Sequence, residues 1–156
     1  MNFLRLIRLL RFGLLAFTAG SALYLARRFT VVRIPGGDRG MEPTFRPGEA
    51  LLVDRRPGTL ARGDVVVFSQ GNGSMRVGRI GALPGQFVDV LDGRLRVNGE
   101  GVLPVLGGAS PPVGVVPDGE ALVVRDNPDP GPKEGTVFER IREERLRGRI
   151  VIGWPF

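Results

Sequence analysis

Few side chains in this sequence are able to act as nucleophiles or bases. The 156 residues include no histidine and no cysteine, so Ser-His and Cys-His pairs, histidine-ligated metals and disulfides are excluded. Of the 22 basic residues only Lys133 is a lysine, and the arginines keep their protons at accessible pH. Catalysis would have to use carboxylates, hydroxyls or this one amine, and we expect no metal and no other cofactor.

The hydroxyls that follow the N-terminal segment include Thr44, Ser69, Ser74 and Ser110. A Ser-Lys pair would need one of them beside Lys133, because a lysine acts as a general base only when burial lowers its pKa. Lys133 lies among prolines and glycines, which favours a solvated loop, and Ser74 ends a glycine-rich stretch typical of a hairpin loop. Such a pair is therefore an alternative and not the expectation.

The acidic residues Asp126, Asp129 and Glu134 lie close together in the sequence. They lack the alternating ligand spacing and the glycine of a calcium-binding loop. A solvated turn is the expectation for this stretch.

The net charge of +6 is confined to one part of the chain. Residues 1–39 carry seven arginines against Asp38, whereas residues 40–156 carry 15 basic and 15 acidic residues. The larger part has no surplus of cations with which to neutralise phosphates. The sequence therefore argues against nucleic-acid binding.

The N-terminal segment is predicted to be a membrane anchor. Residues 12–26 read FGLLAFTAGSALYLA, fifteen uncharged residues between Arg11 and Arg27. A transmembrane helix needs about 20 apolar residues, but flanking arginines snorkel and a bilayer thins locally. A cleaved signal peptide, a retained anchor and an amphipathic surface helix compete as interpretations. A cut near Ala19 would leave a short apolar core, so retention is favoured.

From residue 30 onward, short β-branched runs alternate with glycine and proline, which is typical of strands. These runs are residues 30–34, 50–53, 64–68, 87–91, 94–97, 121–124 and 149–153. Asp92-Gly93 and Asn98-Gly99 accept positive φ and predict tight hairpin turns. Residues 103–119 are predicted as a long loop, and residues 139–147 as a short helix ended by Gly148. The predicted fold class is mostly antiparallel β.

Several short motifs follow one another along this region. They are MEPT at 41–44, GDVVVF at 63–68, RI at 79–80 before LPG at 83–85, DG at 92–93, VNG at 97–99, DN at 126–127 and WP at 154–155. Their order and spacing over residues 30–156 resemble the type I signal peptidase (leader peptidase) family. The resemblance implies a signal-peptidase-like β domain after one transmembrane helix. It also implies removal of signal peptides from exported proteins at the outer membrane surface.

The reactive residues that this resemblance implies are missing. The family has a serine nucleophile immediately before the MEPT motif and a lysine general base just before the LPG box. Gly40 stands at the serine position. Aligned on the LPG box, Gly78 stands at the lysine position and Arg79 matches the family arginine, whereas alignment on Ile80-Gly81 puts Val77 there.

The resemblance also implies a binding groove around these positions. Its residues would be Gly40, Met41, Pro43, Thr44, Arg79, Asp126 and Asn127. The family's Gly-Asp-Asn box reads Arg125-Asp126-Asn127 in this chain, a further departure beside the missing pair.

Three functional hypotheses remain open. The first is a catalytically inactive, membrane-anchored pseudopeptidase that binds extended preprotein or signal-peptide segments, with residues 1–29 as cytoplasmic lead-in and anchor. Residues 30–156 would then form the extracytoplasmic β domain of a single-pass protein of the cell membrane. The second is an active serine endopeptidase with displaced catalytic residues such as Ser74 and Lys133. The third is a β binding module at the membrane surface, unrelated to proteolysis.

Overall fold

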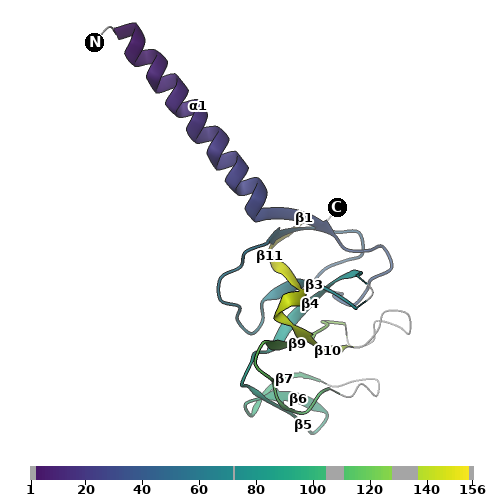
Figure 1. Cartoon of the computed structure of the whole chain (residues 1–156). Coiled ribbons are helices and arrows are strands. Elements are labelled where there is room, and N and C mark those ends of the chain that lie inside the picture. Colours follow the sequence, from purple (N-terminus) through teal and green to yellow (C-terminus); the bar gives the residue numbers. More distant parts are fainter. Residues whose placement is uncertain (1–2, 72, 105–110, 128–136, 155–156) are drawn as a thin grey trace.

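The structure is a computed structural model that describes residues 3–71, 73–104, 111–127 and 137–154 (Figure 1). One long helix, α1 (Phe3–Arg28), projects away from a β body and continues directly into strand β1 (Phe29–Arg33). This confirms the predicted N-terminal helix. In the described part of the chain, no helix is both long and apolar enough to cross a membrane.

The β body consists of two antiparallel sheets. The larger sheet has the strand order β1, β2 (Ala50–Asp54), β11 (Leu146–Trp154), β3 (Val65–Ser69), β4 (Met75–Ala82), β9 (Glu120–Val124) and β10 (Phe138–Arg142). The smaller sheet has the order β7 (Glu100–Pro104), β6 (Arg94–Val97), β5 (Phe87–Leu91) and β8 (Gly114–Val115). The smaller sheet lies at the end of the body far from α1 (Figure 1). The predicted class, mostly antiparallel β, is confirmed.

Each predicted β-branched run overlaps a strand, although the runs 30–34 and 64–68 each extend one residue beyond β1 and β3, and the ends of most strands differ from the prediction. The two predicted hairpin turns are also present, because Asp92 and Asn98 have φ of 51° and 52° and join β5 to β6 and β6 to β7. Type I′ turns require positive φ at these positions, which Asp-Gly and Asn-Gly accept.

The predicted helix at residues 139–147 is wrong. Strand β10 occupies its first part, a 3-10 turn spans Glu143–Arg145, and β11 begins at Leu146. Phe138 and Ile141 are buried, and β10 pairs with β9, so tertiary pairing overrides the helical charge spacing. The predicted loop at 103–119 is also interrupted, because β7 extends to Pro104 and β8 lies at Gly114–Val115. Residues 105–110 of that loop lie outside the described residues.

The core that positions the site connects a loop to the larger sheet. Met41, 1% exposed, lies in a buried cluster with Ile34, Leu51, Val53, Val67 and Val77, contributed by the loop between β1 and β2 and by strands β2, β3 and β4. Burial of a methionine side chain contributes roughly 2 kcal/mol. Met41 therefore fixes the loop that carries Gly40 against the sheet.

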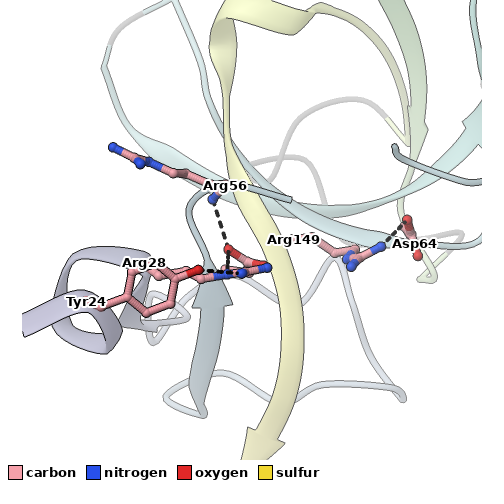
Figure 2. A network of polar contacts seen from close by, with 6 residues as sticks. Tyr24, Arg28, Arg56, Asp64 and Arg149 are labelled. Atoms are coloured by element: carbon pink, nitrogen blue, oxygen red, sulfur yellow. Dashed lines mark hydrogen bonds and ion pairs between the residues drawn. The ribbon is translucent and has the colours of Figure 1, made fainter. Parts of the chain in front are cut away.

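An ion pair connects the end of α1 to the sheet (Figure 2). Arg28 donates from Nε and Nη2 to the carboxylate of Asp54 at 3.0–3.3 Å, and from Nη1 to the Tyr24 hydroxyl at 2.9 Å. The backbone N–H of Arg56 donates to the same carboxylate at 3.0 Å. The hydrogen bond from Arg28 lowers the pKa of Asp54, which is almost fully buried.

Candidate functional site

The loop that follows β1 carries Gly40 in a compact turn. The backbone N–H of Gly40 donates to Asp38 Oδ1 at 3.1 Å, and the N–H of Phe45 donates to the carbonyl of Met41 at 2.9 Å. Gly40 itself is buried, whereas Pro43 and Thr44 are exposed. The turn therefore presents its proline and threonine to solvent while Gly40 faces protein.

A second segment, which follows β9, lies against this turn. The backbone N–H of Asn127 donates to the Gly40 carbonyl at 2.9 Å, and its side-chain amide donates to the Arg39 carbonyl at 2.9 Å. The two motifs are 87 residues apart in the sequence, yet backbone hydrogen bonds join them. The proximity of Gly40 and Asn127 that the resemblance implies is therefore present.

Asp126 connects this segment to Thr44 and to β4. Its carboxylate accepts from the Thr44 hydroxyl at 2.6 Å and from Arg79 Nε and Nη2 at 2.9 and 2.6 Å. Arg79 also donates to the Gly63 carbonyl at 2.9 Å. The hydrogen bond to Asp126 raises the pKa of Arg79, so this guanidinium is a fixed cation and not a base. Of the expected groove residues, Thr44, Arg79 and Asp126 thus form one polar network, and the neighbouring Asn127 is bonded to Gly40 and Arg39.

Arg125 fills the space where a side chain at position 40 would begin. A Cβ built on Gly40 would lie 2.2 Å from Arg125 Nη1, 2.4 Å from Cζ and 2.7 Å from Nε. Arg125 is 3% exposed and donates from Nη2 to both oxygens of Asp38 at 2.9 and 3.0 Å. A buried ion pair, in which Nη2 is shared between both carboxylate oxygens, therefore holds the guanidinium in place.

The backbone at Gly40 has an ordinary conformation, because it is not among the glycines with positive φ. An alanine or serine would be accepted there by the backbone alone. The obstacle to a side chain at position 40 is Arg125.

The two candidate positions for a general base lie on opposite faces of β4. A Cβ on Gly78 would lie 2.3 Å from Val123 Cγ1 and 3.3 Å from Phe68 Cε1, within the cluster formed by β3, β4 and β9. Val77 belongs instead to the cluster that contains Met41. Since neighbouring strand residues point to opposite faces, position 77 shares the core of the Gly40 loop and position 78 does not.

The hydroxyls considered as displaced nucleophiles have other neighbours. Ser74 is exposed at the turn between β3 and β4, where its hydroxyl lies 3.4 Å from Gln70 Oε1. The Ser69 hydroxyl lies 3.4 Å from the Arg145 carbonyl. Ser110, Asp129, Lys133 and Glu134 lie outside the described residues. Within the described ranges, no group of three or more acidic side chains lies close enough together to hold a metal ion.

Similarity to known proteins agrees with this geometry. Residues 9–107 match the family model described as signal peptidase, peptidase S26, which covers more than half of the chain. The chain belongs to the signal peptidase S26 family. Two signal peptidase IB proteins, from Staphylococcus aureus strains COL and Mu50, are 28% identical to it over 160 residues, covering 86% of this chain and 83% of theirs.

Within this signal peptidase family member, sequence reasoning missed the link between two of its departures. Gly40 and Arg125 were each recognised as unusual, but their contact and the role of Asp38 were not. A signal was available in the pattern that the resemblance implies, where the serine position holds Gly40 and the first glycine of the Gly-Asp-Asn box is Arg125. Compensating changes in volume are typical of side chains that contact one another.

Proposed function

We propose that this signal peptidase family member is a membrane-associated pseudopeptidase that binds extended preprotein or signal-peptide segments without hydrolysing them. The observation that carries the proposal is the Arg125 guanidinium in the space beside Gly40. Acyl transfer by this route needs a hydroxyl as nucleophile and a base that accepts its proton. Position 40 supplies no side-chain hydroxyl, and Arg125 leaves no room for one.

Neither position that the resemblance offers for the general base carries one. Val77 and Gly78 are both buried and carry no amine. Arg79, the cation bonded to Thr44's partner Asp126, keeps its proton and therefore cannot act as the base. The Thr44 hydroxyl lies 2.6 Å from Asp126, but it is exposed and both carboxylate oxygens already accept from Arg79. These contacts support binding without turnover.

An extended segment has two features to bind beside this site. Strand β1 is an edge of the larger sheet, and Val31 on it is 60% exposed. Edge strands offer free backbone groups to an added strand. Thr44 and Asn127 add polar side chains from the adjoining loops. Each of these two features is exposed and suits an extended client.

Exposed apolar side chains on α1 support membrane association. Leu10, Phe12, Leu14, Leu15, Phe17, Leu23, Tyr24 and Leu25 are each 53–72% exposed. Arg11 and Arg27 flank the part of this stretch from Phe12 onward, as expected for a helix whose ends lie in a headgroup layer. We propose that α1 holds the β body at the membrane through these exposed apolar side chains, with the body outside the cytoplasm.

The first test is cleavage of a preprotein by the full chain in detergent or vesicles. We expect no cleavage by the wild-type protein or by Gly40→Ser, because Arg125 remains in place. The variant Gly40→Ser with Arg125→Gly and Val77→Lys restores a hydroxyl, the space for it and an amine on the correct face of β4, and we expect it to cleave. Gly78→Lys in place of Val77→Lys is the matched control, and it should stay inactive.

Cleavage by the wild-type protein would overturn the proposal in favour of an active peptidase. Loss of that activity in Ser74→Ala or Lys133→Ala would then identify the displaced pair.

A second test measures binding of a labelled signal peptide. Thr44→Trp fills the surface beside Asp126 without entering the core, and we expect it to weaken peptide binding at least tenfold. Thr59→Trp, another exposed threonine, is the control and should leave binding unchanged. Equal affinity of both variants would favour a β module whose binding surface lies elsewhere.

A further inference from the structure

A hollow of about 550 Å³ opens on the surface of the β body. It is lined by the loop that follows β2 and by the start of β11, and its apolar wall includes Leu60, Leu83 and Leu146. These three leucines are half-buried and pack against the cluster of β3, β4 and β9. The hollow is therefore part of the folded body and is positioned by its core.

Arginines surround this hollow. Arg55, Arg56 and Arg147 line it and are exposed. Arg56 also lines a second hollow with Arg27 and the last turns of α1. Figure 2 shows the Arg56 guanidinium pointing away from the buried carboxylate, on the side of the helix end. We call Arg27, Arg55, Arg56 and Arg147 the arginine belt.

Backbone contacts hold the Arg55–Arg56 part of the belt in place. The N–H of Arg55 donates to the Arg28 carbonyl at 2.8 Å, which joins the loop to the end of the helix. Arg28 is neutralised by Asp54, and Arg147 donates to the Ser69 hydroxyl at 3.2 Å.

No described carboxylate pairs with a member of the belt. Glu143 is the single described acidic residue that lines the two hollows. Cations gathered beside a hollow with so little opposing charge suit an anionic partner.

The belt lies where the apolar surface of α1 ends. Phe17, Leu23 and Leu25 are 72%, 53% and 53% exposed, and Arg27 lies two residues after Leu25. An apolar segment bounded by cations matches the change from hydrocarbon to headgroups at a bilayer surface. A soluble anion would account for the charges but not for the adjoining apolar helix.

We propose that the arginine belt binds the phosphates of anionic phospholipids and so holds this side of the β body against the bilayer. The inference rests on the proposed membrane association of α1. It adds a second, charge-dependent contact made by the folded body itself.

The experiment measures partition of the full chain into vesicles of phosphatidylcholine alone and of phosphatidylcholine mixed with phosphatidylglycerol. Each arginine near an anionic surface contributes about fivefold in affinity. We therefore expect Arg55→Gln with Arg56→Gln to reduce partition into the anionic vesicles more than tenfold and to leave partition into neutral vesicles unchanged. Arg94→Gln is the control for an exposed arginine, because Arg94 lies in the smaller sheet, far from α1.

Neutral vesicles test the proposed membrane association of α1, and the difference between anionic and neutral vesicles tests the arginine belt. Failure of the wild-type protein to bind either would count against membrane association altogether. Equal partition of the wild-type protein into both, or an equal loss with Arg94→Gln, would overturn the belt while leaving the anchor intact. Added salt should reduce the preference for anionic vesicles, since screening at 0.15 M acts over about 8 Å.

Discussion

A side chain introduced at position 40 should destabilise the protein through Arg125. In Gly40→Ala the new Cβ would lie 2.2 Å from Nη1, 2.4 Å from Cζ and 2.7 Å from Nε of that guanidinium. The end of a long side chain normally swings aside at small cost. Here it is 3% exposed and bonded to both oxygens of Asp38, so movement breaks a buried ion pair.

The expected cost follows from these contacts. Overpacking of a buried site costs about 1–3 kcal/mol, and loss of one partner of a buried pair costs about 3–5 kcal/mol. We expect Gly40→Ala to lower the free energy of unfolding by about 3 kcal/mol. The effect should vanish in the presence of Arg125→Ala, which removes the obstructing guanidinium.

The measurement is a double-mutant cycle by denaturant unfolding, followed by circular dichroism in detergent. Gly36→Ala is the matched control, because an added Cβ there has no atom within 4 Å and the backbone φ is ordinary. It should change stability by less than about 1 kcal/mol.

If Gly40→Ala cost the same with and without Arg125→Ala, the guanidinium would not be what excludes the side chain. The structural basis of the proposed inactivity would then be wrong.

Three further predictions concern stability. The pKa of Asp54 is lowered by its hydrogen bond from Arg28, so the stabilisation is present above about pH 4 and is lost as pH falls through the lowered value. Asp54→Asn should therefore cost about 1.5–3 kcal/mol at pH 7, and the difference from the wild-type protein should shrink in acid unfolding curves. Gly148→Ala should cost about 3 kcal/mol in thermal unfolding, because its Cβ would lie 2.4 Å from the Asp54 carbonyl oxygen, which the strand holds in place. Thr44→Val should cost no more than about 1 kcal/mol in the same assay, since the lost hydrogen bond to Asp126 is exposed.

Local sequence predicted the strands whose own residues demand burial. The β-branched runs that became β2 and β3 supply five of the largest fully buried side chains, and the Asp92-Gly93 turn has the φ that its residue types favour. Strand β4 was not predicted, because Gly78 and Gly81 interrupt its apolar pattern. In the fold, Val123 and Val124 side chains lie 2.3 Å from where those glycines would carry a Cβ, so the neighbouring strand requires glycine at both positions.

The structure brings several of the expected groove residues together, but the contact that fills the space beside Gly40 was not expected from the sequence. The resemblance brought Gly40, Thr44 and Asn127 to one place, and the loop contacts agree. The Asp38 to Arg125 pair joins residues 87 positions apart and leaves no local pattern in the sequence. Position 77 was likewise distinguished from position 78 only by the face of β4 on which each lies. Both facts depend on tertiary packing.

The direct passage from α1 into β1 limits where the Gly40 turn can lie relative to the helix. No residue separates Arg28 of α1 from Phe29 of β1, and the ion pair between Arg28 and Asp54 also joins the helix to β2. The helix and the β body are therefore connected without a linker. Gly40 lies twelve residues further on, a contour of at most about 43 Å. Covalent geometry therefore limits how far the Gly40 turn can lie from the end of the helix.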